Sequence, residues 1–194
     1  MPWPVRPLRA DDLPRLRALD YQFVSSQALA VEKTVEGLAV TWCLRPQPLA
    51  DPFTLLDTAP LPEEWATLER NLIAGTREGF VVEADGGPVA FVELEAQTWR
   101  SVGFIWELLV HQPYRRQGIG TALVDAAIAW GRERRLRALA LETQTNNWPA
   151  LNFYRRVGFQ LCAVDDHFYT NRDIAAGEVA LFWYYELETN EPRE

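Results

Sequence analysis

The stretch from Glu107 to Gly120, which reads E-L-L-V-H-Q-P-Y-R-R-Q-G-I-G, constrains the fold more than any other part of the sequence. Apolar residues from Trp106 to Val110 predict a strand, which Pro113 interrupts. After a turn that contains two glycines, apolar residues recur with helical spacing, at Ile119, Leu123, Ala126, Ala127 and Trp130. The sequence therefore predicts a strand, a tight turn and a helix in direct succession.

The turn between that strand and helix has the composition of a phosphate-binding site. Gly118 and Gly120 let the backbone approach a ligand, and the N–H groups and dipole at the start of a helix favour an anion. Arg115 and Arg116 add permanently charged donors that suit phosphate oxygens. The turn has neither the three glycines of a dinucleotide fingerprint nor the Gly-Lys-Ser/Thr of a Walker loop. The predicted ligand is a pyrophosphate, and the alternative is an ordinary turn with basic residues at its bend.

The composition fits one globular domain, residues 1–194. A chain of 194 residues with 48% hydrophobic residues is long enough to bury a core. A net charge of −8 and a pI near 4.9 argue against a nucleic-acid partner. The acidic surface would suit a cationic acceptor, although acidity also serves solubility alone.

Cysteine, histidine and apolar patterns exclude further classes of protein. Cys43, Cys162, His111 and His167 lack the spacing of metal ligands, so we expect no metal and two buried thiols. The N-terminus lacks an apolar signal core, and no run of about 18 apolar residues occurs. These features predict a cytoplasmic protein without a membrane partner.

The N-terminal half, residues 5–100, is predicted to alternate strands and helices. Its elements are a strand (Val5–Arg9), a helix through Leu13, Leu16 and Leu19 with Asp11 and Asp12 as caps, a helix (Glu63–Gly75) carrying Trp65, Leu68, Leu72 and Ile73, and two strands (Phe80–Glu83 and Val89–Glu95) joined by an Asp85-Gly86 turn. Within residues 21–62, strands could lie at 29–33 and 38–44. Five prolines between Arg45 and Pro62 then predict an extended loop.

The C-terminal half, residues 101–188, continues the alternation. After the strand, turn and helix already described, we expect a strand (Leu139–Glu142), a short helix (Asn147–Arg156) with Pro149 in its first turn, and two strands (Phe159–Val164 and Val179–Leu187). One mixed α/β sheet with helices on both faces is the predicted architecture.

Two motifs resemble those of the GNAT superfamily of N-acetyltransferases. Residues 115–120 match R-x-x-G-x-G, and residues 147–159 match N-x-x-A-x-x-x-Y-x-x-x-G-F position by position. Residues 141–147, L-E-T-Q-T-N-N, and the aromatic segment 178–184 are similar to the streptothricin acetyltransferase branch of that superfamily. The likeness covers about half of the chain, from Phe104 onward, and residues 1–100 show none.

The resemblance implies a single-domain GNAT fold that binds acetyl-CoA. The family's fourth and fifth strands, here those ending at Val110 and starting at Leu139, splay apart around the acyl-pantetheine arm. The residues implied in cofactor binding are Leu108, Leu109, Val110 and Asn147 along the arm, and Arg115, Arg116, Gln117, Gly118, Ile119, Gly120 and Thr121 at the pyrophosphate. Asn146, beside Asn147, could equally be the cap of the following helix. Residues 21–62 are expected to supply elements on the acceptor side.

The reaction needs a proton acceptor and a proton donor. An alkyl amine with a pKa of about 10.4 is almost entirely protonated at neutral pH, and a carboxylate, directly or through a water molecule, can take its proton. Glu107, at the head of the strand that borders the thioester, is the candidate base, with a solvated strand-end residue as the alternative. Tyr154 of the second motif is the candidate acid for the leaving thiolate, with a core tyrosine as the alternative.

The acceptor is the least constrained part of the interpretation. Trp42, Trp99 and Trp106 with Asp165 and Asp166 could form an aromatic and acidic pocket for a cation, although tryptophans are more often core residues and Asp165-Asp166 could be a turn. A small cationic amine such as streptothricin is the preferred acceptor. A protein lysine or N-terminal amine is the second hypothesis, and a non-catalytic acyl-CoA sensor is the third. The sequence also allows a homodimer.

Overall fold

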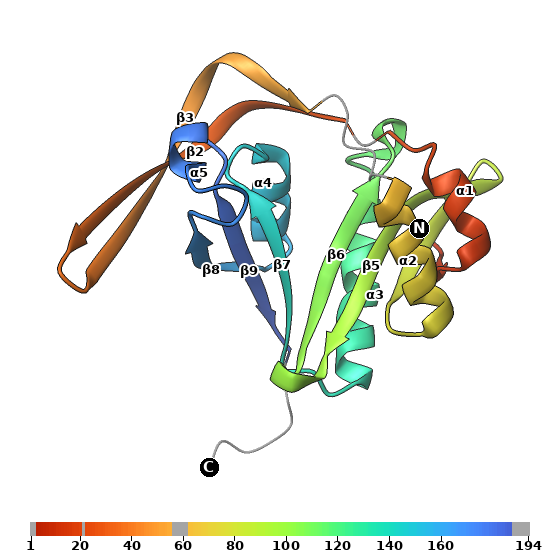
Figure 1. The fold of residues 1–194 in the computed structure, drawn as a ribbon. Coiled ribbons are helices and arrows are strands. Elements are labelled where there is room, and N and C mark those ends of the chain that lie inside the picture. Colours follow the sequence, from red (N-terminus) through yellow and green to blue (C-terminus); the bar gives the residue numbers. More distant parts are fainter. Residues whose placement is uncertain (1–2, 21, 56–61, 188–194) are drawn as a thin grey trace. The chain divides into compact units, whose positions relative to one another are not determined.

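The computed structural model describes residues 3–20, 22–55 and 62–187, and it has an α/β fold (Figure 1). Seven of the described strands form one sheet in the order β1-β4-β5-β6-β7-β9-β8, and β2 and β3 form a separate ribbon. The strands are β1 (Val5–Pro7), β2 (Phe23–Glu36), β3 (Ala39–Leu55), β4 (Glu78–Ala84), β5 (Gly87–Gln97), β6 (Val102–Val110), β7 (Ala138–Gln144), β8 (Gln160–Asp165) and β9 (Ala180–Glu186). The helices are α1 (Leu13–Leu16), α2 (Pro62–Ala74), α3 (Ile119–Glu133), α4 (Trp148–Arg156) and α5 (Asp173–Ala176), with 3-10 turns at Ala10–Asp12, Thr98–Arg100 and Gln112–Tyr114.

The chain forms two compact units. The first contains Met1–Gln22, Asp57–Ala140 and Tyr185–Glu194, and the second contains Phe23–Leu56 and Leu141–Tyr184. β1-β4, β4-β5, β5-β6 and β8-β9 pair antiparallel. β6 and β7 are sheet neighbours joined through α3, the crossover connection that parallel strands require. The sheet is therefore mixed, as the sequence predicts.

One face of the first unit's sheet is covered by α1 and α2. Val81, Phe91 and Leu109 are directly opposite one another on β4, β5 and β6, so their side chains point to the same face. They share a buried core with residues of both helices and one residue that precedes α1. These residues are Leu8 before α1, Leu13 and Leu16 of α1, and Trp65 and Leu68 of α2. Each of these side chains contributes about 1.5–3 kcal/mol by leaving water. This face is the one on which the candidate base lies.

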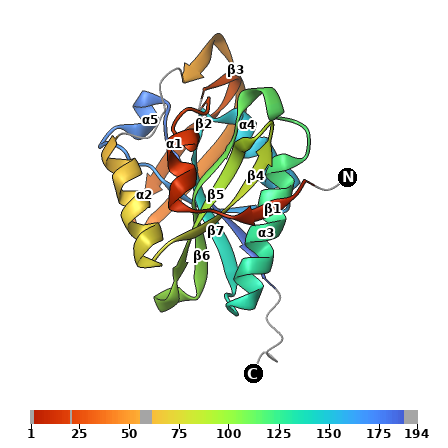
Figure 2. The same ribbon diagram turned by 90° about the vertical axis from the view of Figure 1, so that its right-hand side faces the viewer.

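α3 covers the opposite face of the same sheet (Figure 2). Gly103 of β6 is opposite Ala96, five residues beyond Phe91, and therefore points away from α1 and α2. A Cβ atom at Gly103 would lie 2.5 Å from the ring of Trp130, so only glycine lets α3 pack this closely. The predicted apolar side of α3 is confirmed, because Ile119, Leu123, Ala127 and Trp130 are buried and Ala126 is half-buried.

The second unit contains a long antiparallel hairpin of β2 and β3, drawn in red to orange in Figure 1. The prediction of an extended loop after Arg45 is wrong for residues 45–55, which belong to β3, while residues 56–61 lie outside the described part. Pro46 is opposite Leu29, whose N–H donates to Thr145 O at 3.0 Å and therefore points away from β3. At such a non-hydrogen-bonded pair the missing N–H of proline removes no ladder bond. This is why a proline-rich segment can be a strand here.

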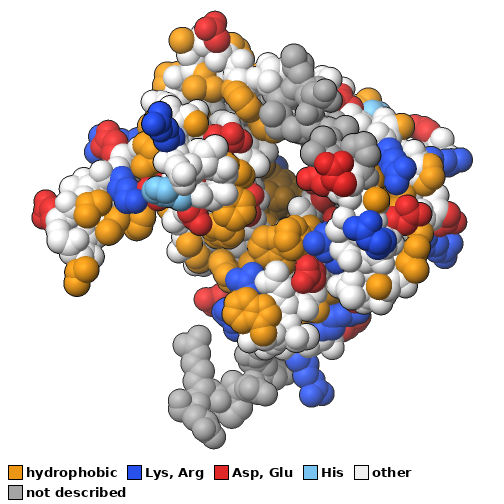
Figure 3. Space-filling view, in the orientation of Figure 1, with side chains coloured by type: hydrophobic (Ala, Val, Ile, Leu, Met, Phe, Trp, Pro, Cys, Tyr) orange, Lys and Arg blue, Asp and Glu red, His pale blue; other side chains and the backbone are white. Residues whose placement is uncertain are grey.

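The free end of this hairpin carries several exposed apolar side chains among charged ones (Figure 3). Val35 is 58% exposed, Val40 is 40% exposed, and Leu38 in the turn is fully exposed. Cys43 on β3 and Cys162 on β8 are free thiols. The prediction that both are buried is wrong. Cys43 is half-buried, and Cys162 is exposed on β8, an edge strand of the seven-stranded sheet.

Most remaining predicted elements are confirmed, with shifts at their ends. The strands predicted at residues 29–33 and 38–44 exist but are much longer, and the Asp85-Gly86 hairpin joins β4 to β5. α1 ends at Leu16 and does not reach Leu19. Ile73 of α2 is 74% exposed, because it lies about 100° around the helix from its neighbour Leu72, which packs on the core.

Candidate functional site

The turn before α3 has the geometry of an anion-binding site. Gly118 caps the helix with φ +86°, and a Cβ atom there would meet nothing within 4 Å, so the space above it is open. The first intrahelical bond runs from Ala122 N to Gly118 O at 3.0 Å. The N–H groups of residues 119–121 precede that bond, so they have no partner inside the helix. The side chains of Arg116, Gln117 and Thr121 are exposed at this end.

The two arginines of the turn have different surroundings. Arg115 donates to three backbone carbonyls, those of Val110 at 2.8 Å, Gln22 at 2.6 Å and Asp20 at 3.0 Å. Burial lowers the pKa of its guanidinium. Arg115 therefore fixes the turn to the end of β6 and to the segment before β2. Arg116 is exposed with φ +60°, so its guanidinium is the one presented at the surface of the turn.

Two further contacts brace the turn, and the sequence motif does not include them. The indole N–H of Trp3 donates to Gln117 O at 2.9 Å, and the side-chain amide of Gln117 donates to Pro113 O at 3.0 Å. On the strand itself, Leu108, Leu109 and Val110 pair with Val92, Phe91 and Ala90 of β5. The buried side chain of Leu109 lies in the core, so its backbone is held in place.

Glu107 lies beside an irregularity in the pairing of β6 with β5. Glu107 is opposite Glu93, and the next pair is Ile105 with Leu94, so Trp106 is an extra residue without a partner on β5. Such β-bulges bend a strand and redirect side chains, and they are common beside active sites. Glu93, two residues from Phe91, shares the face covered by α1 and α2, and its partner Glu107 therefore lies on that face too.

The surroundings of Glu107 suit a proton acceptor. Burial first, and then the negative charges of Glu93 and Glu64, raise the pKa of its carboxyl to about 7 against an opposing hydrogen bond from the Leu108 backbone. A base with a pKa near the operating pH combines an ionised fraction with useful proton affinity. Glu107 is therefore not an ordinary solvated strand-end residue.

In the second unit, Asn147 and Tyr154 lie on α4. The side-chain oxygen of Asn147 accepts a hydrogen bond from Ala150 N at 3.2 Å, so Asn147 rather than Asn146 is the cap of the helix. Tyr154 is buried, with ring centroids of Phe153 at 5.2 Å and Phe159 at 5.6 Å. Tyr154 thus packs as the core-tyrosine alternative predicts, and its role as the acid stays a prediction.

A second carboxylate with a raised pKa, Glu142 on β7, was not singled out from the sequence. Burial raises its pKa to about 7, the phenol of Tyr169 donates a hydrogen bond to it, and the charge of Glu178 opposes its ionisation. Burial and the neighbouring carboxylate also raise the pKa of Tyr169. Glu142 lies within the L-E-T-Q-T-N-N segment, but Tyr169 is 27 residues away, so only folding brings the pair together.

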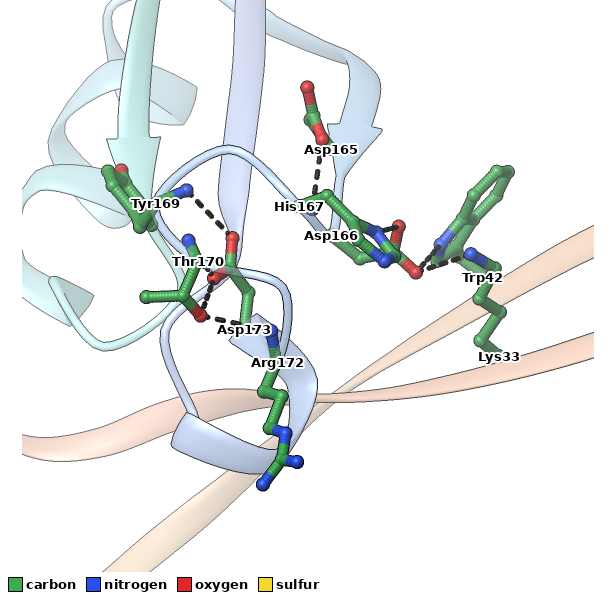
Figure 4. A network of polar contacts seen from close by, with 9 residues as sticks. All are labelled: Lys33, Trp42, Asp165, Asp166, His167, Tyr169, Thr170, Arg172 and Asp173. Atoms are coloured by element: carbon green, nitrogen blue, oxygen red, sulfur yellow. Dashed lines mark hydrogen bonds and ion pairs between the residues drawn. The ribbon is translucent and has the colours of Figure 1, made fainter.

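The residues predicted to form an aromatic and acidic pocket are divided between the two compact units. Asp166 binds a cation of the chain itself, because Lys33 Nζ lies 2.7 Å from its carboxylate and the indole of Trp42 donates to it at 3.3 Å (Figure 4). Asp165 accepts from His167 N at 3.0 Å, as expected of a turn residue (Figure 4). Trp106 stacks with Arg77, and Trp99 is 83% exposed beside Arg100.

Within residues 3–20, 22–55 and 62–187, no group of three or more histidine, cysteine or acidic side chains could hold a metal ion. None of the helices in that part of the chain is long and apolar enough to span a bilayer.

Comparison with known protein families gives a match over more than half of the chain. The sequence model of the Acetyltransferase (GNAT) family matches residues 45–159. Streptothricin acetyltransferase A of Bacillus subtilis is 41% identical over 89 residues, which are 46% of this chain and 51% of that protein. Streptothricin acetyltransferase of Streptomyces lavendulae is 31% identical over 177 residues, 91% of each chain. The chain thus spans about half the length of the first relative and nearly all of the second.

Two solved structures have the same fold. The crystal structure of nourseothricin acetyltransferase is similar with a TM-score of 0.78 and 26% identity, over 97% of this chain and 100% of the other. A putative streptothricin acetyltransferase from Bacillus anthracis, solved in complex with acetyl coenzyme A, gives a TM-score of 0.73 and 21% identity over 95% and 97% of the two chains. At that identity the second likeness concerns the fold alone.

Proposed function

The chain belongs to the GNAT family of acetyltransferases, and we propose on that premise that it transfers an acetyl group from acetyl-CoA to a primary amine of a small, streptothricin-like cation. The membership confirms the family and the fold class predicted from the sequence. The observation that carries the proposed activity is the carboxylate of Glu107, which lies beside a β-bulge opposite Glu93 and has a pKa raised to about 7. The acceptor class is supported by the relatives named streptothricin acetyltransferase.

We propose that the first unit binds the diphosphate of acetyl-CoA at the turn before α3. The backbone N–H groups from Gln117 to Thr121 and the guanidinium of Arg116 would contact phosphate oxygens directly. Arg115 would act by holding the turn in shape, since its donors are used by backbone carbonyls. Backbone groups of residues 108–110 and the side chain of Asn147 would contact the pantetheine arm, as the resemblance implies.

The proposed reaction balances with one base and one acid. The neutral amine nitrogen attacks the thioester carbonyl, and Glu107 takes the proton that the nitrogen loses. The tetrahedral intermediate then expels the thiolate of coenzyme A, which takes a proton from the phenol of Tyr154. The products are the N-acetylated acceptor and free coenzyme A, and solvent returns both side chains to their starting protonation states.

We propose that both units form one N-acetyltransferase domain with the acceptor-side elements in residues 21–62. The family match supports this, because residues 45–159 include segments of each unit. Within those elements, the β2–β3 hairpin forms an ion pair with Asp166 through Lys33, at 2.7 Å. A cytoplasmic location, a homodimer and the lack of a nucleic-acid partner remain predictions.

A thiol-release assay tests the proposal. Coenzyme A release is measured with acetyl-CoA and separate amines: streptothricin, an aminoglycoside, spermidine and a lysine peptide. We expect release with streptothricin, reduced at least about tenfold in Glu107→Gln. Release with the lysine peptide alone would instead support a protein acceptor. Acetyl-CoA binding without release for any amine would support a non-catalytic sensor and contradict the proposed activity.

A further inference from the structure

We propose that Glu93, held by Arg77, is a positioning residue that makes Glu107 the proton-accepting member of a carboxylate pair. This proposal rests on the proposed function, because it gives a role to the residue that Glu107 faces. All the residues involved belong to the first compact unit. Glu93 and Arg77 lie outside the two motifs at residues 115–120 and 147–159.

The register of the sheet brings the two carboxylates together. Glu93 on β5 and Glu107 on β6 are direct cross-strand partners at the bulge that Trp106 creates. Side chains directly opposite each other in an antiparallel pair have Cβ atoms about 4.5–5.5 Å apart, so two carboxylates there repel each other. Glu93 is also buried, with a side chain that is 8% exposed, so water screens this repulsion weakly.

Arg77 makes the pair asymmetric. Its guanidinium forms an ion pair with Glu93 at 2.5 Å and a longer one with Glu95 at 3.5 Å. It also lies 4.2 Å above the ring of Trp106, whose indole N–H donates to Glu95 at 2.6 Å. The bulge residue and the neighbouring carboxylate thus fix Arg77 on the Glu93 side, and no ion pair of the described residues joins Arg77 to Glu107.

The consequence for protonation follows from this asymmetry. When two carboxylates share a site, a proton goes to the member with the poorer electrostatic support. Burial raises the pKa of the Glu93 carboxyl, and the hydrogen bond and charge of Arg77 oppose that rise. Among the described residues no such cation pairs with Glu107, so the shared proton goes to Glu107 in preference to Glu93. The charged groups that face Glu107 are Glu93 on β5 and Glu64 on α2, and both raise its pKa. Glu93 therefore increases the proton affinity of the proposed base without contacting the substrate.

Glu93→Gln tests this role, because glutamine keeps a hydrogen-bond acceptor for Arg77 but removes the charge. We expect the acidic limb of the pH profile of kcat/KM to move down by roughly half to one pH unit, with acetyl-CoA affinity unchanged. Glu95→Gln is the matched control, since Glu95 also contacts Arg77 but is not opposite Glu107. An acidic limb that stays in place in Glu93→Gln, or moves equally in Glu95→Gln, would overturn the proposal.

A second readout separates this proposal from the proposed function. Carbon-13 labelling of glutamate carboxyls allows the titration of Glu107 to be followed by NMR, with the signal identified by its loss in Glu107→Gln. We expect a lower midpoint in Glu93→Gln, and in Arg77→Met we expect the midpoint of Glu93 to rise. If Glu107→Gln keeps full activity while Glu93→Gln lowers the midpoint, the role of Glu107 as base fails but the pairing stands. Unchanged midpoints in both variants refute the pairing itself.

Discussion

Glu107→Gln should make the protein more resistant to unfolding at alkaline pH, whether or not Glu107 is the base. The pKa of Glu107 is raised from 4.5 to about 7 in the folded chain. A folded pKa above the unfolded value means that the folded state binds the proton more tightly. The corresponding stability is fully present below pH 4.5 and is lost as pH rises through 7.

The magnitude follows from the size of the shift. A difference of about 2.5 pKa units corresponds to about 3.4 kcal/mol between the acidic and alkaline limits, from 1.36 kcal/mol per unit. Between pH 5 and pH 8 the wild-type chain should lose about 2.5 kcal/mol of this. Glutamine does not ionise, so the variant should lose none of it. On going from pH 5 to pH 8, the Tm of the variant should therefore rise relative to that of wild type by roughly 5–10 °C for a chain of this length.

The assay is urea unfolding of wild type and variant at pH 5 and pH 8, followed by circular dichroism. The quantity of interest is the free energy of unfolding of the variant minus that of wild type, compared between the two pH values. Glu133→Gln serves as the control, because Glu133 is exposed at the end of α3. Parallel pH dependence in wild type and Glu107→Gln would show that Glu107 titrates normally and would refute the electrostatic reasoning.

Three further predictions concern other parts of the chain. Tyr154→Phe should lower kcat at least about tenfold with little change in acetyl-CoA affinity, and near-wild-type turnover in steady-state kinetics would remove Tyr154 as the acid. Gly118→Asp should weaken coenzyme A binding, measured by calorimetry, at least about tenfold relative to Gly118→Asn. Both variants place a side chain at φ +86°, so they share the same backbone strain and differ in charge. Equal affinities would count against a diphosphate at this turn. Asp166→Asn should speed hydrogen exchange of the β2 amides near Lys33 about two- to fivefold at pH 7, because it removes the ion pair that anchors the hairpin. The hydrogen bond from Lys33 lowers the pKa of Asp166 to about 2, so the ion pair stabilises the hairpin fully above pH 3.8 and is lost as pH falls through 2. An unchanged exchange rate in Asp166→Asn would mean that other contacts hold the hairpin.

Local signals were sufficient for much of the fold. The apolar pattern of residues 119–130, the Asp85-Gly86 turn and Pro149 in the first turn of α4 each act within a few neighbouring residues, and the structure has the corresponding elements. The β3 segment shows where such signals fail. Its prolines predict a loop when the chain is taken alone, but Pro46 occupies a pair position with β2 that needs no N–H donor.

The candidate site also contains some features that the sequence predicts and others that only the fold creates. The sequence by itself determined the glycine turn, the Tyr154 motif and Glu107 as a candidate, because each depends on residue types at a fixed short spacing. Only the tertiary structure decided that Arg115 holds the backbone, that Glu142 meets Tyr169 and that Glu93 faces Glu107. These contacts join residues between 5 and 95 positions apart, and they arise from strand register, a bulge and burial. A pKa near 7 at Glu107 depends on its removal from water and on charges of other elements, which spacing along the chain does not encode.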